Sequence, residues 1–115
     1  MLIAFTIDSN DENAMMDLRF GRCPFFALVD DQGGVRSFLP NDAAGASMGA
    51  GIGAAQELIR AGVEGVVTGQ VGPKAMEILE AADIAVFLLD GSQSLESARG
   101  LLNQGRLRRY QIQRF

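Results

Sequence analysis

The side chains best suited to chemistry gather in one short stretch, residues 19–31. It reads Arg-Phe-Gly-Arg-Cys-Pro and then Phe-Phe-Ala-Leu-Val-Asp-Asp, so a cationic turn runs directly into an apolar strand. Cys23 is the only cysteine of the chain, and Arg19 and Arg22 flank it. Nearby positive charge lowers a thiol pKa, and thiolates select copper(I) and iron–sulfur centres. The turn therefore predicts a site where Cys23 binds metal and the arginines hold an anion; the alternative is a buried cysteine between solvated arginines.

Two further glycine-rich turns follow. Residues 45–53 read Gly-Ala-Ser-Met-Gly-Ala-Gly-Ile-Gly, and residues 68–73 read Thr-Gly-Gln-Val-Gly-Pro. Backbone N–H groups of such turns can hold an anion at a helix N-terminus, and ligands gather beyond the carboxyl ends of strands in open α/β sheets. The structural alternative is close packing through small residues and a tight turn. Together the three turns predict a shallow site for a small anion.

Two nucleotide-binding motifs are excluded. A dinucleotide fingerprint needs a strand that runs directly into the glycines and an acid ~20 residues further on. Here residues 40–42, Pro-Asn-Asp, intervene, and the stretch around residues 69–72 has no acid. A Walker loop needs Gly-Lys-Ser or Gly-Lys-Thr, and the sequence contains neither.

The chain has no histidine, which removes histidine-based catalytic triads and histidine-ligated zinc. One cysteine does not make a thiolate-only iron–sulfur site. Met15, Met16 and Met48 are candidate thioether ligands, although methionines more often fill core gaps. The acidic loop over residues 8–17 lacks the spacing of a calcium loop. Because no nucleophile–base or acid–base pair can be named, we expect no enzyme.

Length and composition predict one domain over residues 1–115. A chain of 115 residues with 48% hydrophobic and 21% charged residues is ordinary for a soluble protein. No apolar run approaches the ~20 residues of a membrane span, and a single cysteine fits the reducing cytoplasm. The net charge of −4 disfavours nucleic acid. Residues 105–115 form a basic tail with four arginines, predicted to be either a docking segment or an edge segment with solvated arginines.

Hydrophobic periodicity predicts alternating strands and helices. Strands are expected at 2–7, 25–29, 35–39, 63–68 and 84–89, and helices at 48–61, from Pro73, and from Ser94 to Gly105. The short 30–34 turn makes 25–29 and 35–39 an antiparallel hairpin, while 66–67 and 84–88 become central parallel strands. The predicted fold is α/β, with a mixed sheet of about five strands flanked by helices.

An ordered set of residues resembles the dinitrogenase iron–molybdenum cofactor family over essentially the whole chain. Its members here are Phe20-Gly21-Arg22-Cys23-Pro24-Phe25-Phe26, Asn41, Gly49-Ala50-Gly51 with Ala54-Ala55, Gly62-Val63, Thr68-Gly69 and Gly72-Pro73. Cofactor-carrying relatives often have a histidine directly before the Phe-Gly pair, where this chain has Arg19. The resemblance is therefore closest to small stand-alone and orange-protein-like members.

The resemblance implies a ribonuclease-H-like fold and non-catalytic binding, carriage or assembly of an iron–molybdenum or molybdenum–copper sulfide cluster or its precursor. It relates the chain to nitrogen fixation and adds an assembly or recipient protein as a candidate partner, with a monomer or weak dimer expected. The alternative is a metal-free regulatory module that binds a phosphate-bearing metabolite or a protein. The predicted binding residues are Arg19, Gly21, Arg22, Cys23, Asn41, Gly49, Gly51, Thr68, Gly69 and Gly72, with Cys23 as the metal ligand.

These residues also give a geometric prediction. We expect Gly49, Gly51, Gly69 and Gly72 to line one depression, with Cys23 at its rim.

Overall fold

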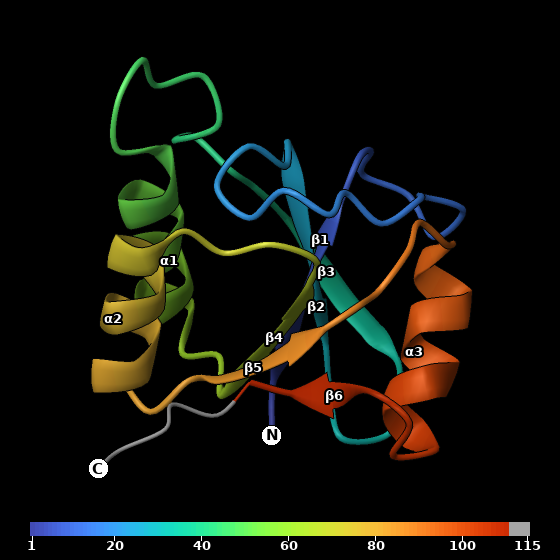
Figure 1. Cartoon of the computed structure of the whole chain (residues 1–115). Coiled ribbons are helices and arrows are strands. Elements are labelled where there is room, and N and C mark those ends of the chain that lie inside the picture. Colours follow the sequence, from blue (N-terminus) through green and yellow to red (C-terminus); the bar gives the residue numbers. More distant parts are fainter. Residues whose placement is uncertain (111–115) are drawn as a thin grey trace, which may run out of the picture.

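The computed structural model describes residues 1–110 and places a mixed six-stranded sheet between two helical layers (Figure 1). The elements in chain order are β1 (Ile3–Ile7), β2 (Phe25–Val29), β3 (Val35–Pro40), α1 (Ala50–Ala61), β4 (Gly65–Thr68), α2 (Pro73–Ala81), β5 (Ala85–Leu88), α3 (Leu95–Asn103) and β6 (Arg108–Arg109). Helices α1 and α2 cover one face of the sheet, and α3 covers the other.

The strands lie in the order β3-β2-β1-β4-β5-β6. The β1–β4 and β4–β5 pairs are parallel, whereas β2 is antiparallel to both β1 and β3. The predicted hairpin and the two parallel strands are therefore confirmed. Parallel pairing brings the carboxyl ends of β1 and β4 to the same edge of the sheet, where their connecting loops must also meet.

The central strands β1 and β4 are buried on two faces, which explains why their sequences are apolar apart from Gly65 and the buried Thr6 and Thr68. Successive side chains alternate between the layers: Ala4 and Val66 pack toward α1 and α2, while Phe5 and Val67 pack toward α3. The core thus consists of two hydrophobic clusters separated by the sheet.

Helix ends follow their local chemistry. Gly62 ends α1 in a left-handed conformation with φ 74°, Pro73 opens α2, and Ser94 Oγ accepts the Ser97 N–H at 3.0 Å to cap α3. The predicted start of α1 at Met48 is two residues early, because Gly49 has φ 74° and lies outside the helix.

The strand count is six rather than the expected five. Arg108 and Arg109 pair antiparallel with Leu88 and Phe87 of β5. A strand of two residues is too short to show a hydrophobic periodicity in the sequence. It forms because the edge of β5 has backbone groups free to pair with it. Its arginines are exposed and Leu107 packs against the core, as the edge-segment alternative predicted. That alternative also expected Tyr110 to pack down, but Tyr110 is 40% exposed, and Ile112 and Arg114 of the tail lie outside the described residues. No helix in residues 1–110 is long and apolar enough to cross a membrane.

Candidate functional site

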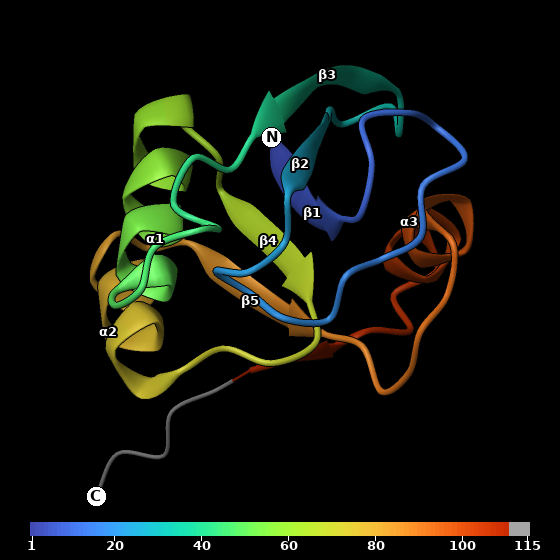
Figure 2. The ribbon, with the colours of Figure 1, turned by 90° about the horizontal axis from the view of Figure 1, so that it is seen from above.

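Three segments distant in sequence meet beyond the carboxyl ends of β1 and β4: residues 17–24, the loop 41–49, and the β4–α2 turn at residues 69–72. Figure 2 looks onto this end of the molecule. The first and third segments pair through their backbones, since the Phe20 N–H donates to Gln70 O at 3.0 Å and the Gln70 N–H donates to Leu18 O at 2.7 Å. Topology thus brings together the turns that the sequence marked separately.

Asn41 joins the loop 41–49 to the Cys23 turn. It is 5% exposed, and its Nδ2 donates to Gly21 O at 3.0 Å and to Cys23 O at 2.8 Å. Its backbone N–H donates to Pro24 O at 2.9 Å. Asn41 therefore fixes the shape of the turn from beneath and has almost no exposed surface with which to contact a ligand.

Gly21 and Gly69 are required by close backbone approach. A Cβ on Gly21 would lie 2.7 Å from Gly51 Cα, and Gly21 has φ +97°, a conformation that side chains strain. A Cβ on Gly69 would lie 2.5 Å from Leu18 Cβ. Close packing, together with the backbone conformation of Gly21, therefore explains why these two positions are glycines.

Gly49 and Gly72 differ, because they cap the N-termini of α1 and α2 and face open space. A Cβ on either would meet nothing within 4 Å. Neither helix has a side-chain cap or an acid in its first turn. In α1 the first bond runs from the Gly53 N–H to Gly49 O, so the preceding N–H groups lack a backbone acceptor.

The two helix N-termini lie at the same end of the molecule (Figure 1). A Cβ on Gly51 would lie 3.2 Å from Ala75 Cβ, which places the first turns of α1 and α2 in contact. Each helix N-terminus carries about half a positive charge. Two of them in contact, without capping carboxylates, create a positive and donor-rich surface.

Arg22 braces the loop above these N-termini. Its Nη1 donates to Ala44 O at 3.0 Å and to Ala46 O at 2.6 Å. Its side chain is exposed, so the guanidinium remains accessible at the surface. The sequence placed Arg22 in the site but gave no sign of these loop contacts.

Arg19 is engaged by an acid. Its Nε and Nη2 donate to the Asp17 carboxylate at 3.1 and 3.0 Å. Burial raises the pKa of Asp17, but the hydrogen bonds and charge of Arg19 outweigh it and hold that pKa below its ordinary value. The Asp17 side chain is 9% exposed and that of Arg19 is 67% exposed. The positive charge of Arg19 is therefore already neutralised.

Cys23 is not at a rim. It is fully buried in the core under α1 and α2. Burial, helped by the charge of Asp17, raises the pKa of Cys23 to about 12, against opposing hydrogen bonds that include one from Asn41. The expectation that the arginines lower this pKa is wrong, because desolvation outweighs them. In this structure Cys23 is a neutral thiol, and metal ligation by it stays a prediction.

The predicted single depression lined by the four glycines stays a prediction, although Cys23 does not lie at its rim. Gly51 and Gly69 are used in packing, and only Gly49 and Gly72 are open. Thr68 is fully buried, with Oγ1 2.9 Å from Thr6 Oγ1. It closes the end of the sheet beneath the surface and does not face outward.

Sequence reasoning missed Lys74. This residue lies in the first turn of α2 beside Ala75, is exposed, and makes no hydrogen bond or ion pair within residues 1–110. The signal was available, since a lysine directly follows the Gly-Pro that opens the helix. Lys74 adds a free cation to the surface formed by the two N-termini.

Coordinating ligands are scarce by comparison. Residues 1–110 contain no group of three or more Cys, Asp or Glu side chains that could hold a metal ion. Of the candidate thioethers, Met16 is buried, whereas Met48 is 87% exposed next to Gly49. The surface therefore offers N–H donors, positive charge and one thioether, which is chemistry for holding an anion.

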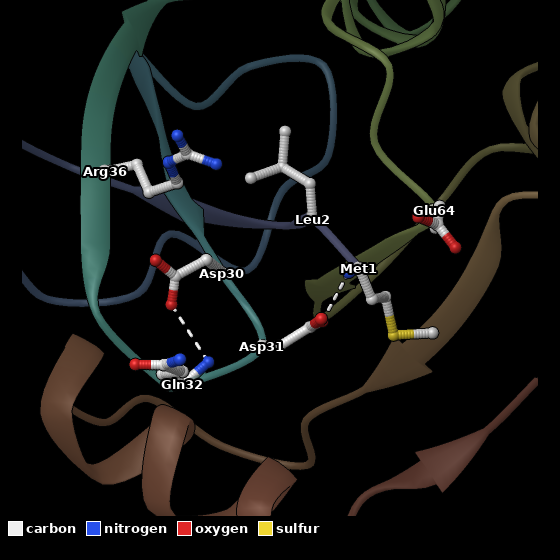
Figure 3. Close-up of a pocket in the computed structure, with 7 residues that line it drawn as sticks. All are labelled: Met1, Leu2, Asp30, Asp31, Gln32, Arg36 and Glu64. Atoms are coloured by element: carbon white, nitrogen blue, oxygen red, sulfur yellow. Dashed lines mark hydrogen bonds and ion pairs between the residues drawn. The ribbon is translucent and has the colours of Figure 1, made fainter.

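Two hollows lie away from this surface. One of about 480 Å³, at the amino ends of β1 and β4, is lined by Met1, Leu2, Asp30, Asp31, Gln32, Arg36 and Glu64 (Figure 3). The Met1 ammonium pairs there with Asp31, and the acids Asp30, Asp31 and Glu64 outnumber the cations. The other, of about 490 Å³, flanks α3 and is lined by Glu12, Asn13, Glu96, Arg99, Gly100 and Asn103. The first hollow is unsuited to an anion.

The fold and this surface define a class of small α/β protein with a donor-rich, ligand-poor site. The model of the dinitrogenase iron-molybdenum cofactor family matches residues 1–105, and the chain belongs to that family. The resemblance carried by the sequence motifs is thus confirmed.

Two solved structures and one further relative, matched by sequence, are similar to this chain. The apo form of the orange protein from Desulfovibrio gigas is 35% identical, with a TM-score of 0.85 over 93% of this chain and 90% of that chain. A putative NifB protein from Thermotoga is 28% identical, with a TM-score of 0.78 over 92% of this chain and 90% of that one. An uncharacterized protein of Methanocaldococcus jannaschii is 26% identical over 114 residues, which are 96% of this chain and 92% of that protein.

Proposed function

We propose that this protein binds and carries, without chemical turnover, an anionic metal–sulfur cluster or its precursor. The observation that carries the proposal is the pair of uncapped helix N-termini at Gly49 and Gly72, in contact through their first turns and flanked by Arg22 and Lys74. Membership of the iron-molybdenum cofactor family supplies the class of cargo.

The donor set fits a cluster held from outside rather than one ligated by the chain. Sulfide and oxide atoms of an anionic cluster accept hydrogen bonds from backbone N–H groups and guanidinium. Because Cys23 is fully buried, the proposed cluster lies at the surface and is held there by N–H donors rather than by the thiol. Of the iron–molybdenum and molybdenum–copper types that the sequence resemblance implies, we propose the molybdenum–copper type, because the resemblance is to orange-protein-like members and the chain is 35% identical to the orange protein.

Such a binding mode allows cargo to be released intact. No metal–thiolate bond has to break when the cluster leaves, and the open surface is accessible to a second protein. We therefore include an assembly or recipient protein as the partner of the loaded form.

The test is a titration of the purified protein with tetrathiomolybdate and copper(I), followed by visible absorption and gel filtration. Colour should elute with the protein, and raising the salt concentration should weaken binding because an exposed charged site is screened. The matched control is Arg36→Ala, which removes one exposed arginine at the acidic hollow and should leave the titration unchanged. Colour that separates from the protein at every salt concentration contradicts the proposal.

A phosphate-bearing metabolite is the second candidate, because the same donors and cations suit phosphate equally well. That function predicts no colour and a rise in melting temperature with inorganic phosphate or a nucleotide, since a ligand that binds only the folded state stabilises it. The two titrations, run side by side, distinguish the candidates.

A further inference from the structure

Only one of the two edges of the Arg22 guanidinium makes hydrogen bonds within residues 1–110. Nη1 has two N–H groups, and its contacts with Ala44 O and Ala46 O use them. No hydrogen bond from Nε or Nη2 is present within residues 1–110. One edge of Arg22 is therefore committed to the loop, and the other is free.

The free edge is the fork that binds anions best. Nε–H and Nη2–H are parallel donors that match two acceptor atoms of one anion. Arg19 shows this use within the same turn, because its Nε and Nη2 hold the two oxygens of Asp17. At Arg22 the same two atoms make no hydrogen bond to a carboxylate of residues 1–110.

The loop depends on Arg22. Residues 44–48 make local turns, from the Ala44 N–H to Asn41 O and from the Ala46 N–H to Ala43 O, both 3.0–3.1 Å. Within residues 1–110, the hydrogen bonds that tie this stretch to a distant segment are the two from Arg22. The order of the loop and the orientation of the guanidinium are therefore linked.

We propose that Arg22 is a positioning residue that couples anion binding to ordering of the 44–48 loop, and that Arg19 takes no part in this coupling. An anion on the Nε–Nη2 fork fixes the guanidinium plane, and the fixed plane holds both loop carbonyls. By reciprocity, an ordered loop increases affinity for the anion. The inference rests on the proposed function and adds to it the residue that makes the loop respond to cargo.

Lysine at position 22 separates the two roles. It keeps the charge, but its single ammonium has no second planar edge with which to hold the loop and the anion in fixed relation. Arg22→Lys should bind the cluster more weakly and should not transmit binding to the loop. The matched control is Asp17→Asn/Arg19→Gln, which removes the neighbouring ion pair without changing the net charge.

The experiment is hydrogen exchange of the 44–48 amides, with and without tetrathiomolybdate and copper(I). In the wild type, bound cluster should slow exchange on the order of tenfold, the effect of about one additional charge-assisted hydrogen bond. The double control should show the same slowing, and Arg22→Lys should show none at saturating cluster. Melting curves of all variants confirm that each is folded.

The outcomes separate this inference from the proposed function. A coloured wild-type complex whose loop exchange does not change overturns the coupling alone. Equal slowing in Arg22→Lys, or loss of slowing in the double control, also overturns it. No coloured complex in the wild type overturns the proposed function, and the coupling with it.

Discussion

Two arginines three residues apart differ in whether a carboxylate already neutralises their positive charge. Arg19 lies near the ends of β1 and β4, and the Nε and Nη2 atoms of its planar fork donate to the largely buried carboxylate of Asp17. Arg22 donates to the neutral carbonyls of Ala44 and Ala46, and its Nε–Nη2 fork makes no hydrogen bond within residues 1–110. The sequence gives both the same role, whereas the structure makes one an internal ion pair and the other a surface donor.

The comparison shows that an arginine near a glycine turn is available to bind an anion only when no carboxylate of the protein already accepts hydrogen bonds from its donors. Asp17 stands two residues before Arg19, and its backbone position also lets it accept the Arg19 N–H at 3.0 Å. The region around Arg22 has no acid between Asp17 and Asp30 in sequence. The Arg19 ion pair is therefore a contact between near neighbours in the chain, but only the folded structure shows that, within residues 1–110, no acid from a distant position reaches Arg22.

The largest expected effect comes from the backbone that supports the Arg22 region. Gly21→Ala puts a Cβ 2.7 Å from Gly51 Cα at φ +97°, and strain plus overpacking of this kind costs about 2–5 kcal/mol. Urea unfolding measures the loss. Gly100→Ala, in a helix with open space around it, is the control and should stabilise by about 0.5–1 kcal/mol. Equal stability of the two variants would mean that the turn does not pack on α1.

Removing the free arginine should come next. Arg22→Ala should weaken cluster binding by about 10- to 100-fold, which corresponds to the 1.5–3 kcal/mol of a charge-assisted hydrogen bond. Spectrophotometric titration at fixed salt measures it. Lys74→Ala tests the second free cation of the surface and should give a smaller loss. If Arg22→Ala binds as tightly as the wild type, the difference drawn between the two arginines has no functional meaning.

Cys23 lies between the two regions and provides a pH test. Its pKa is raised to about 12 in the folded protein, above the 9.0 of a free thiol. Above pH 9 the unfolded chain loses this proton and the folded chain keeps it, so stability should fall by about 1.4 kcal/mol per pH unit until about pH 12. Unfolding of wild type and Cys23→Ala, compared from pH 7 to 11, measures the difference.

In Cys23→Ala this contribution to the pH dependence should vanish, while the visible spectrum of the bound cluster should survive. A lost spectrum would show that the buried thiol reaches the metal after all. Parallel pH curves for the two proteins would show that the thiol is exposed in solution.

The smallest effect should come from the engaged arginine. Asp17→Asn/Arg19→Gln should change cluster affinity by no more than about twofold, because Asp17 already neutralises the charge of Arg19 and the double variant keeps the net charge. The same titration as for Arg22→Ala checks it. A loss as large as that of Arg22→Ala would place Arg19 in the site and remove the contrast.

Much of the fold was predictable from local pattern. Unbroken apolar runs at 66–67 and 84–88 predicted buried parallel strands, and Gly62, Pro73 and Ser94 marked helix ends through their own backbone or side-chain chemistry. The ordered motifs also indicated the family. The two-residue strand β6 was beyond reach, because it exists only as the partner of an open sheet edge.

For the candidate site, too, some features followed from the local sequence and others depended on tertiary contacts. Residue types determined that glycines, arginines and a cysteine would lie in three turns, since charge, size and backbone freedom belong to the residue itself. Only the tertiary structure decided that Cys23 is buried and protonated, that Gly51 and Gly69 serve packing while Gly49 and Gly72 stay open, and that Arg22 rather than Arg19 is free. Burial and donor occupancy depend on neighbours brought together from distant positions in the chain, and these neighbours set the pKa of a thiol and the availability of a guanidinium.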